Sequence, residues 1–121
     1  MDILVFEPDG DGPFPGLIVA QHFPLAHTGL ENDPFTIGVG ECLAAAGYAC
    51  VIPFIFHWWP PHEEMEVKRN AFRDDWAVAD LVATWAVLAG LDRVDRMRTG
   101  IIGHCWGGRV SWLGACHNPK F

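Results

Sequence analysis

The chain has 121 residues, of which 50% are hydrophobic and 19% are charged, and its 8 basic and 15 acidic side chains give a formal net charge of −7. Length and composition are typical of one folded domain with its own hydrophobic core, which excludes an intrinsically disordered protein. The acidic charge and the scattered basic residues argue against a nucleic-acid or membrane partner, because both would need a basic patch.

The sequence has no secretory signal or membrane span and no Cys-x-x-Cys pair, which bear on the location of the protein and on the state of its thiols. Residues 1–7 lack the basic leader and the cleavage site of a secretory signal, and no apolar run approaches the ~20 residues that span a bilayer. We therefore expect a cytoplasmic protein. No two cysteines form a Cys-x-x-Cys pair, so we expect free thiols, with Cys42, Cys50 and Cys116 in the core.

Four apolar segments are predicted to form β-strands. The first, residues 3–6, is stopped by a cluster of turn-forming residues at 7–13. The other three are continuous apolar runs, typical of strands that are buried on both faces of a parallel sheet, and they lie at residues 16–22, 48–53 and 98–104.

Each of the three buried strands is followed by a predicted helix. The first spans residues 33–46 and has Asp33 as its N-cap, the second runs unbroken over residues 64–89, and the third spans residues 106–116. Three strand–helix pairs in succession imply right-handed crossovers. The sequence therefore predicts an α/β fold, a three-layer sandwich with a mostly parallel sheet and helices on both of its faces.

The most informative motif is Gly103-His104-Cys105-Trp106-Gly107-Gly108, a G-x-C-x-G-G sequence between a predicted strand and a predicted helix. In the corresponding serine motif the nucleophile sits on a sharp, strained turn, and the glycines let strand and helix approach closely. Cys105 takes that position here. The helix that begins beside it offers free N–H groups and a positive dipole end, and both favour a thiolate. We predict that Cys105 is a nucleophile, the alternative being a tight turn around a small buried residue.

Together with this motif, three further segments resemble the dienelactone hydrolase family of α/β-hydrolases. They are Val19-Ala20-Gln21-His22-Phe23, Ala46-Gly47-Tyr48-Ala49 and Asp80-Leu81. The resemblance covers nearly the whole chain but only the N-terminal half of a family member. Residues 1–121 are therefore expected to form a single, truncated domain with a partial α/β-hydrolase fold.

The resemblance implies a hydrolase of small carboxylic esters or lactones that needs no cofactor. Cys105 would attack the carbonyl carbon, and the backbone N–H groups of Phe23 and Trp106 would hold the oxyanion. The family's triad acid and triad histidine lie in its C-terminal half, and nothing here can be assigned to them. An arginine of the family binds a substrate carboxylate, and both Arg69 and Arg73 lie near that place. The alternative is that both lie on a solvated helix face with Glu66, Asp74 and Asp75.

His22 is the candidate base for Cys105. It falls where the family carries a glutamate that helps to ionise the thiol, and it ends a strand that is expected to neighbour the Cys105 strand. We therefore hypothesise a Cys105–His22 dyad, the alternative being a strand-end histidine bonded to backbone.

Residues 54–61 form a predicted aromatic loop, interpreted either as a wall of the substrate site or as a packed surface loop. His57 and His62 flank its tryptophans with a spacing that fits no helical metal site, so no metal is expected. Asp80 lies among apolar neighbours of the second helix and is a candidate anchor between that helix and a loop.

Two other functions fit the sequence. A chain without the C-terminal half would be a catalytically silent folded domain, and the sheet edge beside the Cys105 strand would then pair with a second copy. Self-association through that edge is expected. Cys105 would alternatively be a redox-sensing thiol, with Cys116 on the following helix.

Overall fold

The computed structural model describes residues 1–23, 32–118 and 120–121, which form four strands and four helices. In order they are β1 (Ile3–Phe6), β2 (Phe14–Ala20), α1 (Pro34–Ala45), β3 (Ala49–Pro53), α2 (Met65–Asn70), α3 (Asp74–Gly90), β4 (Val94–Gly103) and α4 (Trp106–His117). The strand predicted at residues 98–104 begins already at Val94, and a register shift between Pro15 and Gly16 accommodates the longer pairing with β2.

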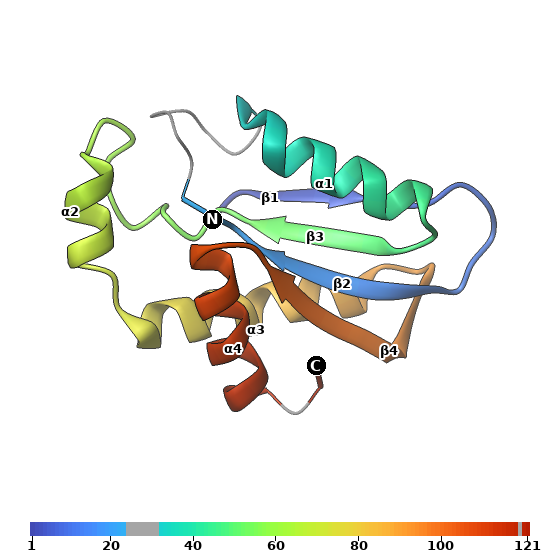
Figure 1. The fold of residues 1–121 in the computed structure, drawn as a ribbon. Helices are drawn as coiled ribbons and strands as arrows, with labels where there is room; N and C mark the ends of the chain where they lie inside the picture. The colour runs from blue at the N-terminus through green and yellow to red at the C-terminus, as the bar shows by residue number, and fades with distance from the viewer. Residues whose placement is uncertain (24–31, 119) are drawn as a thin grey trace.

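The four strands form one mixed sheet in the order β1-β3-β2-β4. β2 pairs with β3 and with β4 in parallel, whereas β1 pairs antiparallel to β3 at the edge. The three parallel strands end on the same side of the molecule, where α2 also lies (Figure 1). The last pair joins Ala20 to Gly103, so the strand before His22 neighbours the strand before Cys105, as predicted.

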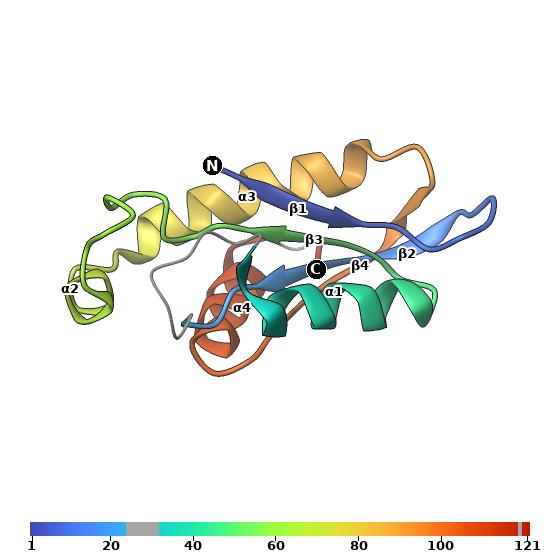
Figure 2. The ribbon, with the colours of Figure 1, turned by 90° about the horizontal axis from the view of Figure 1, so that it is seen from above.

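Helices cover both faces of this sheet. α1 packs on β1 and β3 on one face, and α3 and α4 pack against each other and against the other face (Figure 1, Figure 2). Because side chains alternate along a strand, each face has its own apolar core. The larger core lies under α3 and α4 and includes Ile18, Val51, Leu81, Leu88 and Val110, and the smaller lies under α1 and includes Val19, Cys50 and Ile52. The predicted three-layer α/β architecture is confirmed.

The start of α1 follows its sequence signals. The Asp33 side chain accepts hydrogen bonds from the backbone N–H of Phe35, at 3.3 Å, and from the hydroxyl of Thr36. Both bonds satisfy groups that the first turn of a helix leaves without partners. Gly47 follows the helix with φ +89°, a conformation that glycine adopts without strain. The predicted boundaries of this helix are confirmed to within a residue.

The single helix predicted over residues 64–89 is wrong, because the chain leaves the helical path between α2 and α3. Phe72 stands at this break, and its ring packs against the rings of Phe56, Trp59 and Trp106. Arg73 follows in an extended conformation and starts α3. Burying a large aromatic ring outweighs the hydrogen bonds of one helical turn, which the periodicity of the sequence cannot reveal.

One sheet edge is open among the described residues. β4 pairs with β2 along one side, and none of the described strands pairs along its other side. Met97 on β4 and Trp112 on α4 are 90% and 73% exposed. Self-association through this edge stays a prediction. No helix in the described ranges is long and apolar enough to cross a membrane.

All four cysteines are free, as predicted, but their burial differs from the expectation. Only Cys50 is buried, and Cys42 and Cys116 are exposed, so their predicted place in the core is wrong. Cys42 lies on α1 and Cys116 lies in the last turn of α4. Apolar sequence neighbours suggested burial, but the rotation of each helix places these two side chains toward solvent.

Alkaline pH should destabilise the fold through Cys50. Burial raises the pKa of this thiol to about 11, against 9.0 for a thiol in water, because the thiolate loses its hydration. The stabilising effect is complete below the unfolded value and is lost as the pH rises toward the folded value. Between about pH 8 and about pH 10.5, we expect the free energy of unfolding in urea to fall more for the wild type than for Cys50→Ala. Equal falls in the two proteins would contradict this burial.

Candidate active site

Cys105 stands at the turn between β4 and α4. Only His104 and Cys105 separate the end of the strand at Gly103 from the start of the helix at Trp106. Cys105 has φ 54° and ψ −118°, and no other non-glycine residue among the described ones has a positive φ. A side chain held in this region is strained, and such strain persists only where the surrounding structure enforces it. The turn leaves Cys105 exposed beyond the carboxyl end of β4.

Two glycines of the motif allow the strand, the turn and the helix to pack this closely. A Cβ on Gly103 would collide with the backbone carbonyl of Gly107, and a Cβ on Gly107 would collide with the carbonyl oxygen of Ala20 on β2. A Cβ on Gly108 would only make an ordinary contact, 3.6 Å from the carbonyl oxygen of Gly103. The packing therefore requires the first two glycines of the motif and not the third.

Two backbone N–H groups near this turn have no acceptor among the described residues. The N–H of Gly107 donates to the carbonyl of His104, and the N–H of Gly108 donates to that of Cys105. Neither the N–H of Trp106 nor that of Phe23 donates a hydrogen bond to a described residue. Both donors belong to residues that lie beside Cys105 in one cavity.

This cavity is open and has a volume of about 710 Å³. Its walls are Phe23, Met65, Glu66, Arg69, Cys105 and Trp106. The rings of Phe23 and Trp106 meet edge to face at 4.8 Å, and α2 supplies the facing side chains. The structure thus distinguishes the two candidate arginines. Arg69 lines the cavity, whereas Arg73 forms an exposed ion pair with Asp75 at 2.7 Å.

The Trp106 ring packs against a cation and an aromatic ring. The guanidinium of Arg109 lies 5.0 Å from the centre of the Trp106 ring and pairs with Asp74 on α3 at 2.6 Å. Phe72 contacts the same ring edge to face. These contacts fix the residue whose N–H follows Cys105.

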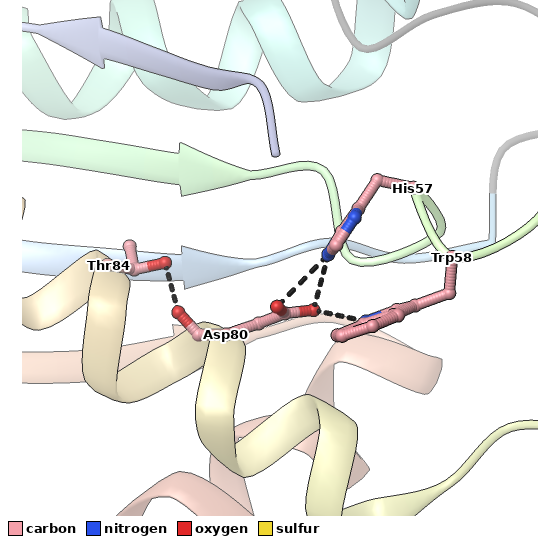
Figure 3. Close-up of polar contacts among 4 residues, drawn as sticks. All are labelled: His57, Trp58, Asp80 and Thr84. Atoms are coloured by element: carbon pink, nitrogen blue, oxygen red, sulfur yellow. Dashed lines mark hydrogen bonds and ion pairs between the residues drawn. The ribbon is translucent and has the colours of Figure 1, made fainter.

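The aromatic loop packs against α3 and does not line the Cys105 cavity. The imidazole Nε2 of His57 lies 3.0 and 3.1 Å from the two carboxylate oxygens of Asp80, and the indole N–H of Trp58 donates to one of them at 2.9 Å (Figure 3). The Thr84 hydroxyl donates to the Asp80 carbonyl at 2.7 Å. Asp80 therefore anchors the helix to the loop. The isolated acid in an apolar helix signalled the anchor, but no pattern in the sequence identified His57 and Trp58 as its partners.

His22 faces α1. Its Nε2 lies 3.5 Å from a carboxylate oxygen of Asp33, and its ring meets that of Phe35 at 4.6 Å. It lines a second cavity, between α1 and the sheet, of which Cys105 is not a wall. No hydrogen bond between His22 and Cys105 occurs among the described contacts, and the dyad stays a prediction.

No group of three or more histidine, cysteine, aspartate or glutamate side chains is arranged to hold a metal ion in the part of the chain that the structure describes. Of the two histidines that flank the tryptophans, His57 is paired with Asp80 and His62 is exposed.

Known proteins are similar to this chain over most of its length. The sequence model of the dienelactone hydrolase family matches residues 1–121. A protein of Methylorubrum extorquens provisionally named carboxymethylenebutenolidase is 30% identical over 93% of this chain and 39% of its own length. A protein of Escherichia coli K12 with the same name is 34% identical over 91% of this chain and 41% of its own length.

A solved structure extends the likeness to three dimensions. The crystal structure of a provisionally assigned dienelactone hydrolase from Klebsiella pneumoniae superposes with a TM-score of 0.72 at 26% identity. The match covers 99% of this chain and 57% of that one. The chain spans about two fifths of the length of the curated relatives it matches. Because the family model matches all of residues 1–121, the strained Cys105 turn included, the chain belongs to the dienelactone hydrolase family.

Proposed function

We propose that this chain carries the nucleophile of an ester- or lactone-hydrolysing site, and that the nucleophile is the Cys105 thiol. The observation that supports this most is the positive φ of an exposed cysteine between β4 and α4. A strained turn at a strand–helix junction presents a nucleophile to a substrate at the carboxyl edge of the sheet. A buried structural cysteine would need neither the strain nor the exposure.

The proposed reaction has two steps. The Cys105 thiolate attacks the carbonyl carbon, the bond to the leaving alkoxide breaks, and the alkoxide takes a proton, which leaves a thioester on the sulfur. Water then attacks the thioester, releasing the carboxylic acid and the thiol. In both steps the N–H groups of Phe23 and Trp106 would stabilise the negatively charged oxygen, because neither has another acceptor among the described residues.

The position of Arg69 favours a substrate that carries a carboxylate. Its side chain lines the same cavity as Cys105, and a guanidinium binds a carboxylate through two parallel hydrogen bonds. The name of the curated relatives describes a butenolide, an unsaturated lactone, with a carboxymethylene group. For such a substrate, Arg69 would hold the carboxylate while Cys105 attacks the lactone carbonyl.

Mass spectrometry of the protein after reaction with p-nitrophenyl acetate tests this proposal. We expect the wild type to gain one acetyl group and release p-nitrophenol, and Cys105→Ala to release it at least about 100-fold more slowly. Cys116→Ala is the matched control, because it removes another exposed thiol and should react like the wild type.

The same experiment separates the two candidate functions. Sustained turnover that depends on Cys105 would mean that a general base is supplied by this chain or by a second copy of it. One acetyl group without turnover would mean a reactive nucleophile in a catalytically incomplete unit. Equal acetylation of the wild type and Cys105→Ala would overturn the assignment of the nucleophile.

A further inference from the structure

Arg109 lies one turn after Trp106 on α4, and its guanidinium covers the Trp106 ring. The central carbon of the guanidinium lies 5.0 Å from the centre of that ring and 5.9 Å from the centre of the Phe72 ring. A cation at such a distance is attracted to the negative face of an aromatic ring. Asp74, the first residue of α3, accepts a hydrogen bond of 2.6 Å from the same guanidinium. The cation over Trp106 is therefore tied to a neighbouring helix.

This ion pair lies at the surface. The side chains of Arg109 and Asp74 are 44% and 52% exposed. Exposed pairs contribute little to the stability of a fold, because water screens the attraction. The consequence of the pair is geometric, since it keeps a planar guanidinium over one aromatic ring.

The peptide that joins Cys105 to Trp106 is under strain. Cys105 has φ 54° and ψ −118°. At such a φ the favoured ψ is about +47°, which the chain would reach by rotating this peptide and the Trp106 N–H with it. A hydrogen bond of 3.0 Å from the Gly108 N–H to the Cys105 carbonyl opposes the rotation. One such bond contributes about as much free energy as the strain costs, so further contacts are needed to hold the peptide.

The Trp106 side chain supplies these contacts. Its ring meets the rings of Phe23 and Phe72 edge to face, at 4.8 and 5.3 Å, while Arg109 lies over it. Rotation of the strained peptide would shift the Cα of Trp106 and pull the ring out of this packing. Phe23 carries the second proposed oxyanion donor, so the same packing ties the two donors together.

We propose that Arg109 is a positioning residue for the oxyanion site, acting through the Trp106 ring to keep the Trp106 N–H directed at the developing oxyanion. The inference rests on the proposed function of Cys105. Arg109 is not a wall of the Cys105 cavity, so it acts on the donor and not on the substrate.

Two reactions of the same thiol test the proposal. Acetylation by p-nitrophenyl acetate passes through an oxyanion, whereas alkylation by iodoacetamide displaces iodide from a saturated carbon and forms none. Both reagents are neutral, and peptide mass spectrometry follows each reaction at Cys105. We expect Arg109→Gln to slow acetylation about tenfold, less than the loss of a whole oxyanion donor would. Alkylation should stay within about twofold of the wild-type rate, because it depends only on the thiolate and its exposure.

Two further variants complete the test. Asp74→Asn keeps the guanidinium but removes the charge that holds it over the ring, so it should slow acetylation less, by about threefold. Arg73→Gln is the matched control, because Arg73 lies 5.2 Å from the Trp76 ring and pairs with Asp75 at 2.7 Å, outside the Cys105 cavity. This control should be acetylated and alkylated as the wild type is.

Four results would overturn the proposal. If the wild type were not acetylated at Cys105, the proposed function would fail and this inference with it. If the wild type and Arg109→Gln were acetylated equally fast, the inference alone would fail. Equal slowing of acetylation and alkylation in Arg109→Gln would mean that Arg109 acts on the thiol or on the fold. Equal slowing of acetylation in Arg73→Gln would mean that the loss of any exposed arginine has this effect.

Discussion

Gly107→Ala is expected to lower the free energy of unfolding by about 3 kcal/mol. The new Cβ would collide with the carbonyl oxygen of Ala20, and this contact joins two backbones, neither of which can rotate away as a side chain can. Relief requires α4 to move off β2, which opens the core that Val110 shares with Ile18. Urea denaturation followed by tryptophan fluorescence measures the loss.

Gly108→Ala is the matched control, one residue along the same helix. Its Cβ would make only an ordinary contact, and alanine is a better helix former than glycine. We expect this variant to range from unchanged to about 1 kcal/mol more stable than the wild type. If both variants were equally stable, α4 would not approach β2 as closely as the structure has it.

Asp80→Ala is expected to cost about 3 kcal/mol, because it removes the acceptor of two hydrogen bonds at once. Asp80 is 6% exposed, and the imidazole Nε2–H of His57 and the indole N–H of Trp58 have no other acceptor among the described residues (Figure 3). Asp80→Asn keeps a carbonyl oxygen for one donor but loses the charge, so it should cost less, about 1 to 2 kcal/mol. Urea denaturation of the three proteins gives the order.

Asp75→Ala is the control for this prediction. It removes an acid from the same helix, where the carboxylate forms an exposed ion pair with Arg73. Exposed pairs contribute little to stability, so this variant should unfold nearly as the wild type does. If Asp80→Ala were as stable as Asp75→Ala, the loop at residues 54–61 would not depend on its anchor to α3.

The part of the candidate site that could be predicted rests on short segments of sequence. The G-x-C-x-G-G motif predicted the turn at Cys105, because two of its glycines are required wherever a strand and a helix meet so closely. Asp33 predicted the start of α1, since a cap bonds to residues two and three positions away. Continuous apolar runs likewise predicted the buried strands and the order in which helices follow them.

Contacts between distant segments could not be predicted in this way. The periodicity of residues 64–89 favours one helix, and only the packing of Phe72 against the Trp106 ring shows why the helix breaks. The choice of Arg69 over Arg73 as a wall of the Cys105 cavity depends on the rotation of α2, and the pairing of His57 with Asp80 joins residues 23 positions apart.

The sequence by itself thus determined the α/β architecture, the strained cysteine turn and the family, because each depends on residues that are neighbours in the chain. Only the tertiary structure decided that His22 faces Asp33, that the buried Gln21 side chain has no hydrogen-bond partner among the described residues, and that Cys42 and Cys116 reach solvent. The physical reason is that side-chain direction and burial are set by packing between elements, which depends on how each helix is rotated on the sheet.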